Sequence, residues 1–200
     1  AARYYGAQKE KDIQDTVHTA IMMAILSGLF LVVLGESASK PMLTLMGTPD
    51  DVLDQAALYL RIYFFGMPVL MIYNFGAALL RAVGDTRRPL YFLFAAGAVN
   101  VVLNLFFVIQ LGMGVDGVAW ATVISECVSA GLIIRSLMKE NGAMKLHLTK
   151  LRIVSGKLTQ IVRVGLPAGM QGAIFSISNV LIQSSVNSFG SIAMAGNTAS

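Results

Sequence analysis

Long uncharged runs alternate with short polar connectors along this chain, and the pattern predicts five membrane-spanning helices. We expect the first four spans at about residues 14–35, 52–80, 89–111 and 115–137, and the fifth after Gly165. Each run reaches the length of about 20 residues that a helix needs to cross the hydrocarbon core. Backbone groups must be paired within such a segment, which favours helices over barrel strands here. The fold class predicted is an all-α, polytopic transmembrane helical bundle.

The second span has its own local signal. Pro68 cannot continue the helical hydrogen-bond ladder, and Gly66 just before it leaves room for a bend. Arg61 lies near one end of the same span, where a long side chain can reach the membrane interface. We therefore predict a kink near Pro68.

Basic residues alternate between the connectors and predict the orientation. The segment before the first span and the second and fourth connectors are rich in lysine and arginine, whereas the first connector has only Lys40 and the third has none. The positive-inside rule places the basic-rich segments in the cytoplasm. The sequence thus predicts a multi-pass protein of the cell inner (plasma) membrane. The basic-rich residues are Arg3, Lys9 and Lys11, then Arg81, Arg87 and Arg88, then Arg135, Lys139, Lys145, Lys150, Arg152, Lys157 and Arg163.

Composition agrees with a membrane protein and argues against other classes. The chain is 56% hydrophobic and only 13% charged, and its net charge of +4 lies in connectors rather than on a basic face with aromatics, so no nucleic-acid partner is expected. A lone Cys127 cannot form an intrachain disulfide or a cysteine metal cluster. His18 and His147 have no ligand-type neighbours in sequence. Catalytic and phosphate-binding motifs are missing, so neither an enzyme nor a cofactor is expected.

Polar side chains inside the spans are the candidate functional residues, because they are costly to bury in hydrocarbon. Asn100 and Asn104 lie four residues apart on the third span, as do Thr122 and Glu126 on the fourth, so each pair shares a helix face. Asn74 lies in the second span. Together these five could form an oxygen-rich site for Na⁺ or a proton relay. The alternative is interhelical hydrogen bonding that only stabilises the bundle.

A second polar stripe is expected on the fifth span. Gln171, Asn179 and Gln183 recur at spacings of eight and four residues, which places them along one side of the helix. On an otherwise apolar span such a stripe indicates a water-filled substrate cavity. Helix packing is the alternative interpretation, because small residues such as Gly169 accompany the stripe.

Several segments resemble the multidrug and toxic compound extrusion (MATE) transporters over nearly the whole chain. They are ARYYGAQ before the first span, MGTPDDV, YLRIYFFGMP, NFGAALLRAVGDTRRPL, NVVLNLFFV, GMGVDGVAWATVIS and VRVGLPAGMQ. The block GAALLRAVGDTRRP followed by G-V-x-G-x-A-x-A-T is the most specific part of the resemblance.

The resemblance implies a place for each part of the chain in a twelve-helix, two-lobe transporter. Residues 1–138 would be part of the N-terminal lobe, residues 139–160 the cytoplasmic inter-lobe linker, and residues 161–200 the first helix of the C-terminal lobe with the external turn after it. The chain would then correspond to helices three to seven. A monomer is expected for the full-length protein.

The resemblance also implies a site. In the family, polar residues on helices one, four, five and six form a cation site, and Asn74, Asn100, Asn104 and Thr122 stand where residues of the last three helices should be. Several relatives carry aspartate where this chain has Asn104. We hypothesise that Glu126, one turn beyond Thr122, supplies the displaced acid, with Na⁺ or H⁺ as the coupling ion.

The predicted function is therefore a cation-coupled antiporter that exports cationic or amphipathic xenobiotics and drugs across the cytoplasmic membrane. Two alternative functions remain open from the sequence alone. A lipid-linked precursor flippase of similar architecture should have a more basic central cavity than Arg61 alone provides. A non-transporting membrane subunit would need its buried asparagines for stability only.

Overall fold

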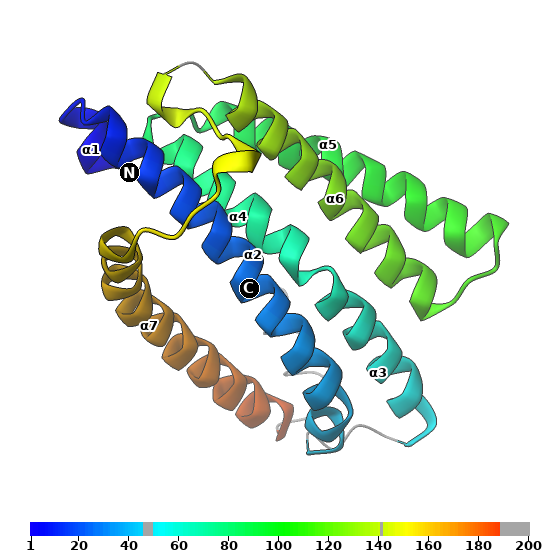
Figure 1. The fold of residues 1–200 in the computed structure, drawn as a ribbon. Coiled ribbons are helices and arrows are strands. Elements are labelled where there is room, and N and C mark those ends of the chain that lie inside the picture. The colour runs from blue at the N-terminus through cyan, green and yellow to red at the C-terminus, as the bar shows by residue number, and fades with distance from the viewer. Residues whose placement is uncertain (46–49, 141, 189–200) are drawn as a thin grey trace. The chain divides into compact units, whose positions relative to one another are not determined.

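The computed structural model describes residues 1–45, 50–140 and 142–188, and all regular elements within them are helical (Figure 1). This confirms the predicted all-α class. The chain divides into two compact units, Ala1–Lys157 and Leu158–Ser200. The elements are α1 (Ala2–Gly6), α2 (Glu10–Leu45), α3 (Asp50–Phe65), α4 (Met67–Ala82), α5 (Arg87–Leu105) with a π-helical turn (Phe106–Gln110), α6 (Val115–Lys139), two short 3₁₀ turns (Gly142–Met144 and Leu148–Lys150) and α7 (Ser155–Ser188).

Four of these helices are individually long and apolar enough to cross a membrane. They are Glu10–Thr44, Arg87–Gln110, Val115–Lys139 and Ser155–Asn179. The pair Val52–Phe65 and Met67–Ala82 passes the same test together and makes a fifth span if the bent pair is counted as one. The bent pair covers the segment in which the sequence predicts the second span.

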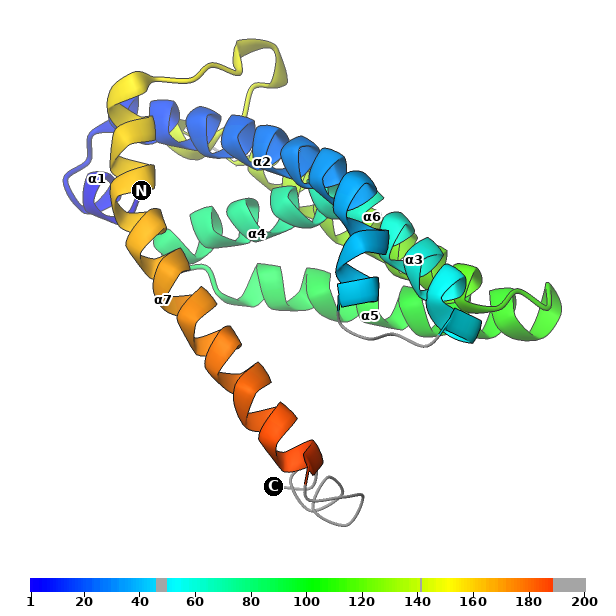
Figure 2. The same cartoon turned by 90° about the horizontal axis from the view of Figure 1, so that it is seen from below.

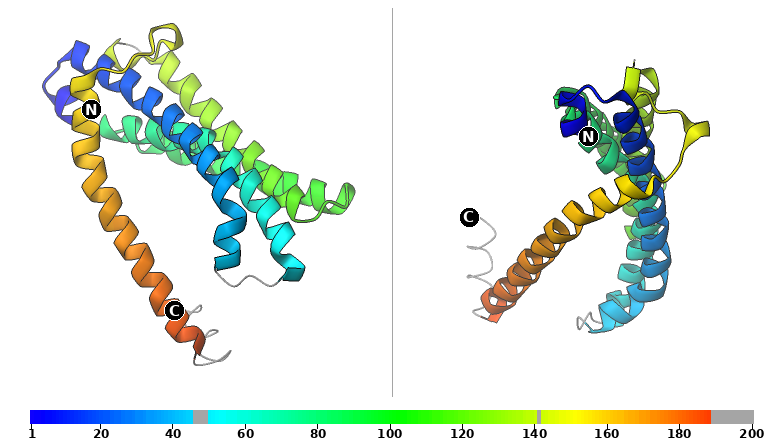
Figure 3. Two further views of the ribbon diagram at one scale, coloured as in Figure 1. Left: turned by 60° about the horizontal axis from the view of Figure 1, so that its bottom comes forward. Right: turned by 60° about the vertical axis from the view of Figure 1, so that its left-hand side comes forward.

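Within residues 1–157 the helices follow a simple spatial order. The bent pair α3/α4 packs against α2 on one side and against α6 on the other, and α5 packs mainly against α6. Figure 2 shows α2 and α5 on opposite sides of α4, and Figure 3 shows α2 and α3 next to each other toward one end of this unit. Helix α6 therefore has one face toward the bent pair and another toward α5.

The predicted kink is present as a break between α3 and α4. The two helices meet at Gly66 with a bend of 45°. Pro68 has no N–H to donate to the carbonyl four residues earlier, which explains why the ladder is interrupted here. Helix α2 approaches the break closely: a Cβ on Gly28 would overlap the backbone of Pro68. A small residue at this crossing allows the two helices to pack.

Helix α2 extends further than the sequence pattern predicts. The first span was expected to end near residue 35, but the helix continues to Leu45 and includes Pro41. The hydroxyls of Ser37, Ser39 and Thr44 donate to the carbonyls four residues earlier, so these turn-forming residues are accommodated within the helix. The polar residues that suggested a connector thus form an extension of the span.

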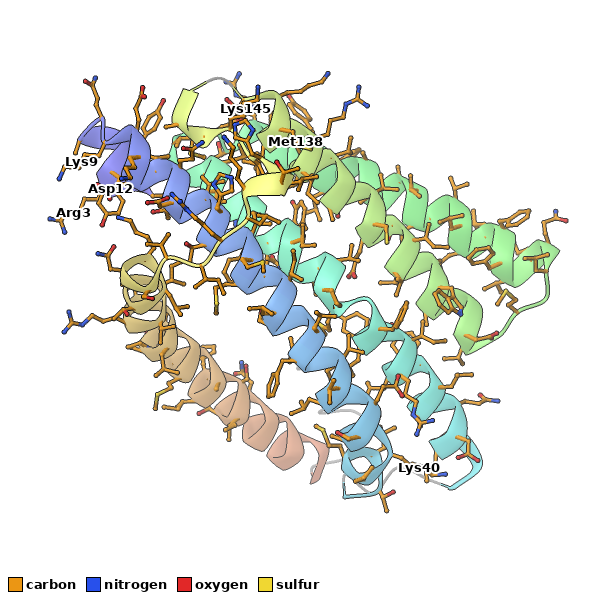
Figure 4. The ribbon with its side chains drawn as sticks, viewed as in Figure 1. Arg3, Lys9, Asp12, Lys40, Met138 and Lys145 are labelled. Carbon is orange, nitrogen blue, oxygen red and sulfur yellow. The ribbon has the colours of Figure 1, made fainter. Side chains whose placement is uncertain are left out.

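The two ends of the first unit differ in charge, as the alternation of basic connectors predicts. Figure 4 places Arg3, Lys9 and Lys145 at the end where α2 begins, and Lys40 at the opposite end. Lys40 forms an ion pair with Asp54 there, with 2.9 Å between Nζ and Oδ1. By the positive-inside rule, we expect the end that carries Arg3, Lys9 and Lys145 to face the cytoplasm.

The connector after α6 is attached to the beginning of α2. The backbone N–H groups of His147 and Val154 donate to the side chains of His18 (3.3 Å) and Thr19 (3.2 Å), respectively. The Lys157 ammonium donates to Asp12 at 2.7 Å. Arg152 and Asp15 form a further ion pair. Within the region predicted as a linker, residues 139–160, the stretch 142–157 is therefore held against α2 by several contacts.

Helix α7 constitutes the described part of the second unit. Its side chains from Leu158 to Asn179 are exposed or half-exposed, and Pro167 lies within it. The helix runs to Ser188. The external turn predicted after it lies outside the described residues.

Candidate functional site

Three of the five residues predicted for a cation site lie in one hydrogen-bond network between α5 and α6. The Asn104 side-chain amide donates to Oδ1 of Asn100 at 2.9 Å. The Asn100 amide donates in turn to the hydroxyl oxygens of Thr122 (3.4 Å) and Ser125 (3.3 Å). The network thus crosses the α5–α6 interface and contains two amides and two hydroxyls.

The hydroxyl protons in this network are already committed. Thr122 donates to the carbonyl of Val118 at 3.0 Å, and Ser125 donates to the carbonyl of Thr122 at 2.7 Å. Both hydroxyl oxygens are therefore oriented as acceptors toward α5. The network can therefore offer oxygen lone pairs to a cation, whereas the hydroxyl protons of its described residues are already donated to backbone carbonyls.

Asn104 Oδ1 is the unsatisfied atom of the network. It is buried and has no hydrogen-bond partner among the described residues. A buried acceptor without a partner costs about 1–3 kcal/mol, so its presence calls for an explanation. A cation coordinated by this oxygen would supply the missing partner, because Na⁺ and similar hard cations prefer oxygen ligands.

Glu126 lies on the face of α6 that is turned toward the bent pair. A Cβ on Gly66 would lie 3.4 Å from its Oε2, so the carboxyl group reaches the break between α3 and α4. The side chain is half-buried. Glu126 makes no side-chain hydrogen bond to the asparagine network in the described structure, although Thr122 is one helical turn away on the same helix. The network and the acid therefore occupy adjacent faces of α6.

The other predicted residues lie apart from this network. Asn74 is exposed on α4 and donates to the carbonyl of Leu70 on its own helix at 3.0 Å. Gln171 and Asn179 are exposed on α7. Gln183 belongs to α7, but its side chain lies outside the described residues. Whether these side chains line a cavity stays a prediction.

Sequence reasoning missed Ser125. It accepts from Asn100 and is buried, at 5% exposure. Its position three residues after Thr122 would have placed both hydroxyls near one face of the span. Serine is common in apolar helices, and for that reason its position alone carried little signal.

Comparisons with known proteins agree with this architecture. The MatE family model matches residues 1–131. The chain is 32% identical over 200 residues to the probable multidrug resistance protein YoeA of Bacillus subtilis (strain 168), covering 96% of this chain and 43% of that protein. It is 30% identical over 167 residues to the probable multidrug resistance protein YpnP of the same organism, covering 79% and 35%.

A solved structure shows the same fold. The crystal structure of MATE in the bent conformation has a TM-score of 0.88 and 26% identity, covering 98% of this chain and 44% of that one. The chain thus spans less than half the length of the relatives it matches. The family match, the identity to curated relatives and the shared fold agree: this chain belongs to the MatE family of multidrug efflux transporters.

Proposed function

We propose that this chain forms part of a cation-coupled antiporter that exports cationic or amphipathic organic compounds in exchange for Na⁺ or H⁺. The observation that carries the proposal is the unpartnered Oδ1 of Asn104 within the network of Asn100, Thr122 and Ser125. In this proposal a cation binds at that oxygen.

Coupling would require the cation to stabilise one arrangement of the helices over another. Glu126 is suited to this role because its carboxyl lies beside Gly66, where the helical ladder of α3 and α4 is interrupted. A change in the charge of Glu126 would act at the break between α3 and α4, where the backbone hydrogen-bond ladder is interrupted. Helix α6 carries Glu126 and also Thr122 and Ser125, the two hydroxyl partners of Asn100, so a shift of α6 would affect both the acid and the network.

Two further features are consistent with export rather than flipping of lipid-linked precursors. The sequence relatives named above are called multidrug resistance proteins. Arg61 is exposed and lies 3.7 Å from Glu36, so its charge has an acidic neighbour.

The test uses the full-length protein that contains this chain. Its expression in an efflux-deficient bacterium should raise resistance to ethidium-like cations. Proteoliposomes should then show export that depends on an imposed Na⁺ or H⁺ gradient. Unchanged resistance together with gradient-independent transport would contradict the proposal.

A further inference from the structure

A recess of about 290 Å³ lies between the cytoplasmic ends of α5 and α6, separate from the asparagine network. Its lining combines three basic residues with apolar and hydroxyl side chains: Arg88 and Phe92 from α5, and Leu132, Arg135, Ser136 and Lys139 from α6. Such a volume is near the lower end of small-ligand pockets. It is large enough for a polar headgroup but small for most drug-sized compounds.

The charges of the recess are unevenly neutralised. Arg88 forms ion pairs with both Asp85 and Glu140, and also donates to the Ser136 hydroxyl oxygen at 3.1 Å. Arg135 and Lys139, by contrast, make no ion pair among the described residues and are exposed. Two cationic side chains one helical turn apart are thus available to an anion.

Asp85, one of the two acid partners of Arg88, remains ionised at neutral pH. Burial alone would raise the pKa of Asp85, but hydrogen bonds from Arg88 and its positive charge lower that pKa below its ordinary value. Arg88 is therefore held by its acids and orders the wall of the recess. An incoming anion would be bound mainly by Arg135 and Lys139.

The hydroxyl of Ser136 can add a hydrogen bond. Its oxygen accepts from Arg88, and this is its one side-chain hydrogen bond in the described part of the chain. The hydroxyl proton is consequently free to be donated to an oxygen anion. Two cations and a hydroxyl donor are a chemical set that suits a phosphate group.

The lining of the recess is basic at the ends of the two helices and becomes apolar deeper in the spans. Arg88 and Lys139 lie at the ends of the two spans, whereas Phe92 lies about one turn deeper and Leu132 about two turns deeper. Neighbouring residues of α5, Leu90, Tyr91, Leu93 and Phe94, are exposed apolar side chains of the kind that contact acyl chains. Basic pockets between spans on the cytoplasmic side are typical sites for anionic lipid headgroups.

We propose that the recess between Arg135, Ser136 and Lys139 binds the phosphate of an anionic membrane phospholipid, with the acyl chains along Phe92 and Leu132. The bound lipid joins the ends of α5 and α6 at the cytoplasmic surface. This site does not depend on the transport mechanism proposed above.

The experiment measures lipid retention by native mass spectrometry of the full-length protein, purified in detergent with equal amounts of phosphatidylglycerol and phosphatidylcholine. We expect preferential retention of phosphatidylglycerol. The double variant Arg135→Gln, Lys139→Gln should weaken it about 30-fold, the equivalent of two charges at about 1 kcal/mol each. The variant Arg81→Gln, Lys145→Gln removes the same two kinds of charge at the same membrane side and should retain the lipid.

Further arms separate the other outcomes. Arg135→Lys provides a second test that does not depend on the folding of the double variant. It keeps the positive charge and should preserve most of the phosphatidylglycerol retention. Millimolar inorganic phosphate should not displace the lipid. Displacement by inorganic phosphate would instead assign the recess to a soluble anion. Equal retention by the double variant and its control, or no preference for phosphatidylglycerol, would overturn the proposal.

Discussion

Glu126 of α6 reaches Gly66 at the break between α3 and α4, since a Cβ on Gly66 would lie 3.4 Å from Glu126 Oε2. The same Cβ would lie 2.8 Å from Cγ2 of Val123, so the carboxyl and an apolar side chain share the space next to the glycine. An ionisable group within a span is a default candidate for function. Its position at the break gives that role a structural basis.

Replacing Glu126 with glutamine should impair coupling without unfolding the protein. Glutamine has nearly the same size, so the thermal midpoint should change little, whereas cation-dependent transport should fall at least about tenfold, within the usual range of coupling energies. The measurement is gradient-driven efflux in proteoliposomes. Asp116→Asn removes an acid from the first turn of the same helix and should leave transport intact. Equal transport by E126Q and wild type would exclude the proposed role.

Replacing Asn104 with alanine should abolish the stabilisation that the coupling ion provides. A ligand present at 100 times its dissociation constant stabilises the folded state by about 2.7 kcal/mol. The thermal midpoint of wild type should therefore rise with Na⁺, or change with pH if H⁺ is the coupling ion, and that of N104A should not.

Thr44→Ala is the matched control for N104A. Thr44 is exposed on α2, and its hydroxyl donates to the carbonyl of Lys40 on its own helix. T44A should keep the ion response of the wild type. An ion response that survives in N104A would show that its Oδ1 is not a ligand.

Gly76 is predicted to be essential for the contact between α4 and α6. A Cβ at this position would overlap Cγ2 of Ile133 and lie 3.6 Å from Cδ1 of Leu137. Overpacking of this kind costs about 1–3 kcal/mol, so Gly76→Ala should lower the thermal midpoint. Gly131→Ala serves as control, because no described residue other than its own helix backbone lies within 4 Å of its Cβ position. That variant should be neutral or slightly stabilising, since alanine favours helix by about 1 kcal/mol. Equal thermal midpoints for Gly76→Ala and Gly131→Ala would contradict the close contact between α4 and α6 at Gly76.

Attachment of the connector to α2 should weaken on acidification. Burial lowers the pKa of His147 below its ordinary value of 6.5, and the charges of Lys150, Lys145 and His18 lower it further. The detached connector therefore binds more protons than the attached one, and stability is lost as the pH falls below about 6.5 toward the folded pKa. The attachment itself uses a second histidine: Nδ1 of His18 contacts the Gln14 carbonyl, and Nε2 of His18 accepts from the His147 N–H.

Hydrogen exchange of residues 145–154 at pH 7.5 and 5.5, corrected for intrinsic rates, measures this effect. Protection in wild type should decrease at the lower pH. His147→Gln cannot gain a proton and should show a smaller change. Identical pH responses in the two proteins would rule out a contribution from His147.

Much of the architecture could be predicted from patterns within short segments of the sequence. Uncharged runs predicted the helical class, and Pro68 with Gly66 predicted the bend, because both follow from the chemistry of a single segment. The end of the first span was misjudged for the converse reason. Ser37, Ser39 and Thr44 favour turns in general, but their hydroxyls can also bond within a helix, and the pattern could not distinguish the two.

The candidate site depended more strongly on packing. Spacing placed Asn100 with Asn104 and Thr122 with Glu126, and these intrahelical relationships require only the period of a helix. The helical period does not tell which face of α6 packs against α5 and which packs against the bent pair. The side chains of Thr122 and Glu126 therefore diverge to different neighbours, although they are four residues apart.

The sequence by itself determined the nature of the apolar segments, the difference in charge between their two ends and the position of the break, because hydrophobicity, charge and proline act locally. The tertiary structure decided which polar atoms are paired. Asn104 Oδ1 is left without a partner, Ser125 joins the network and Glu126 meets Gly66 only once α3, α4, α5 and α6 are packed. Contacts between helices depend on their relative rotation and crossing, which arise from side-chain packing across the whole bundle.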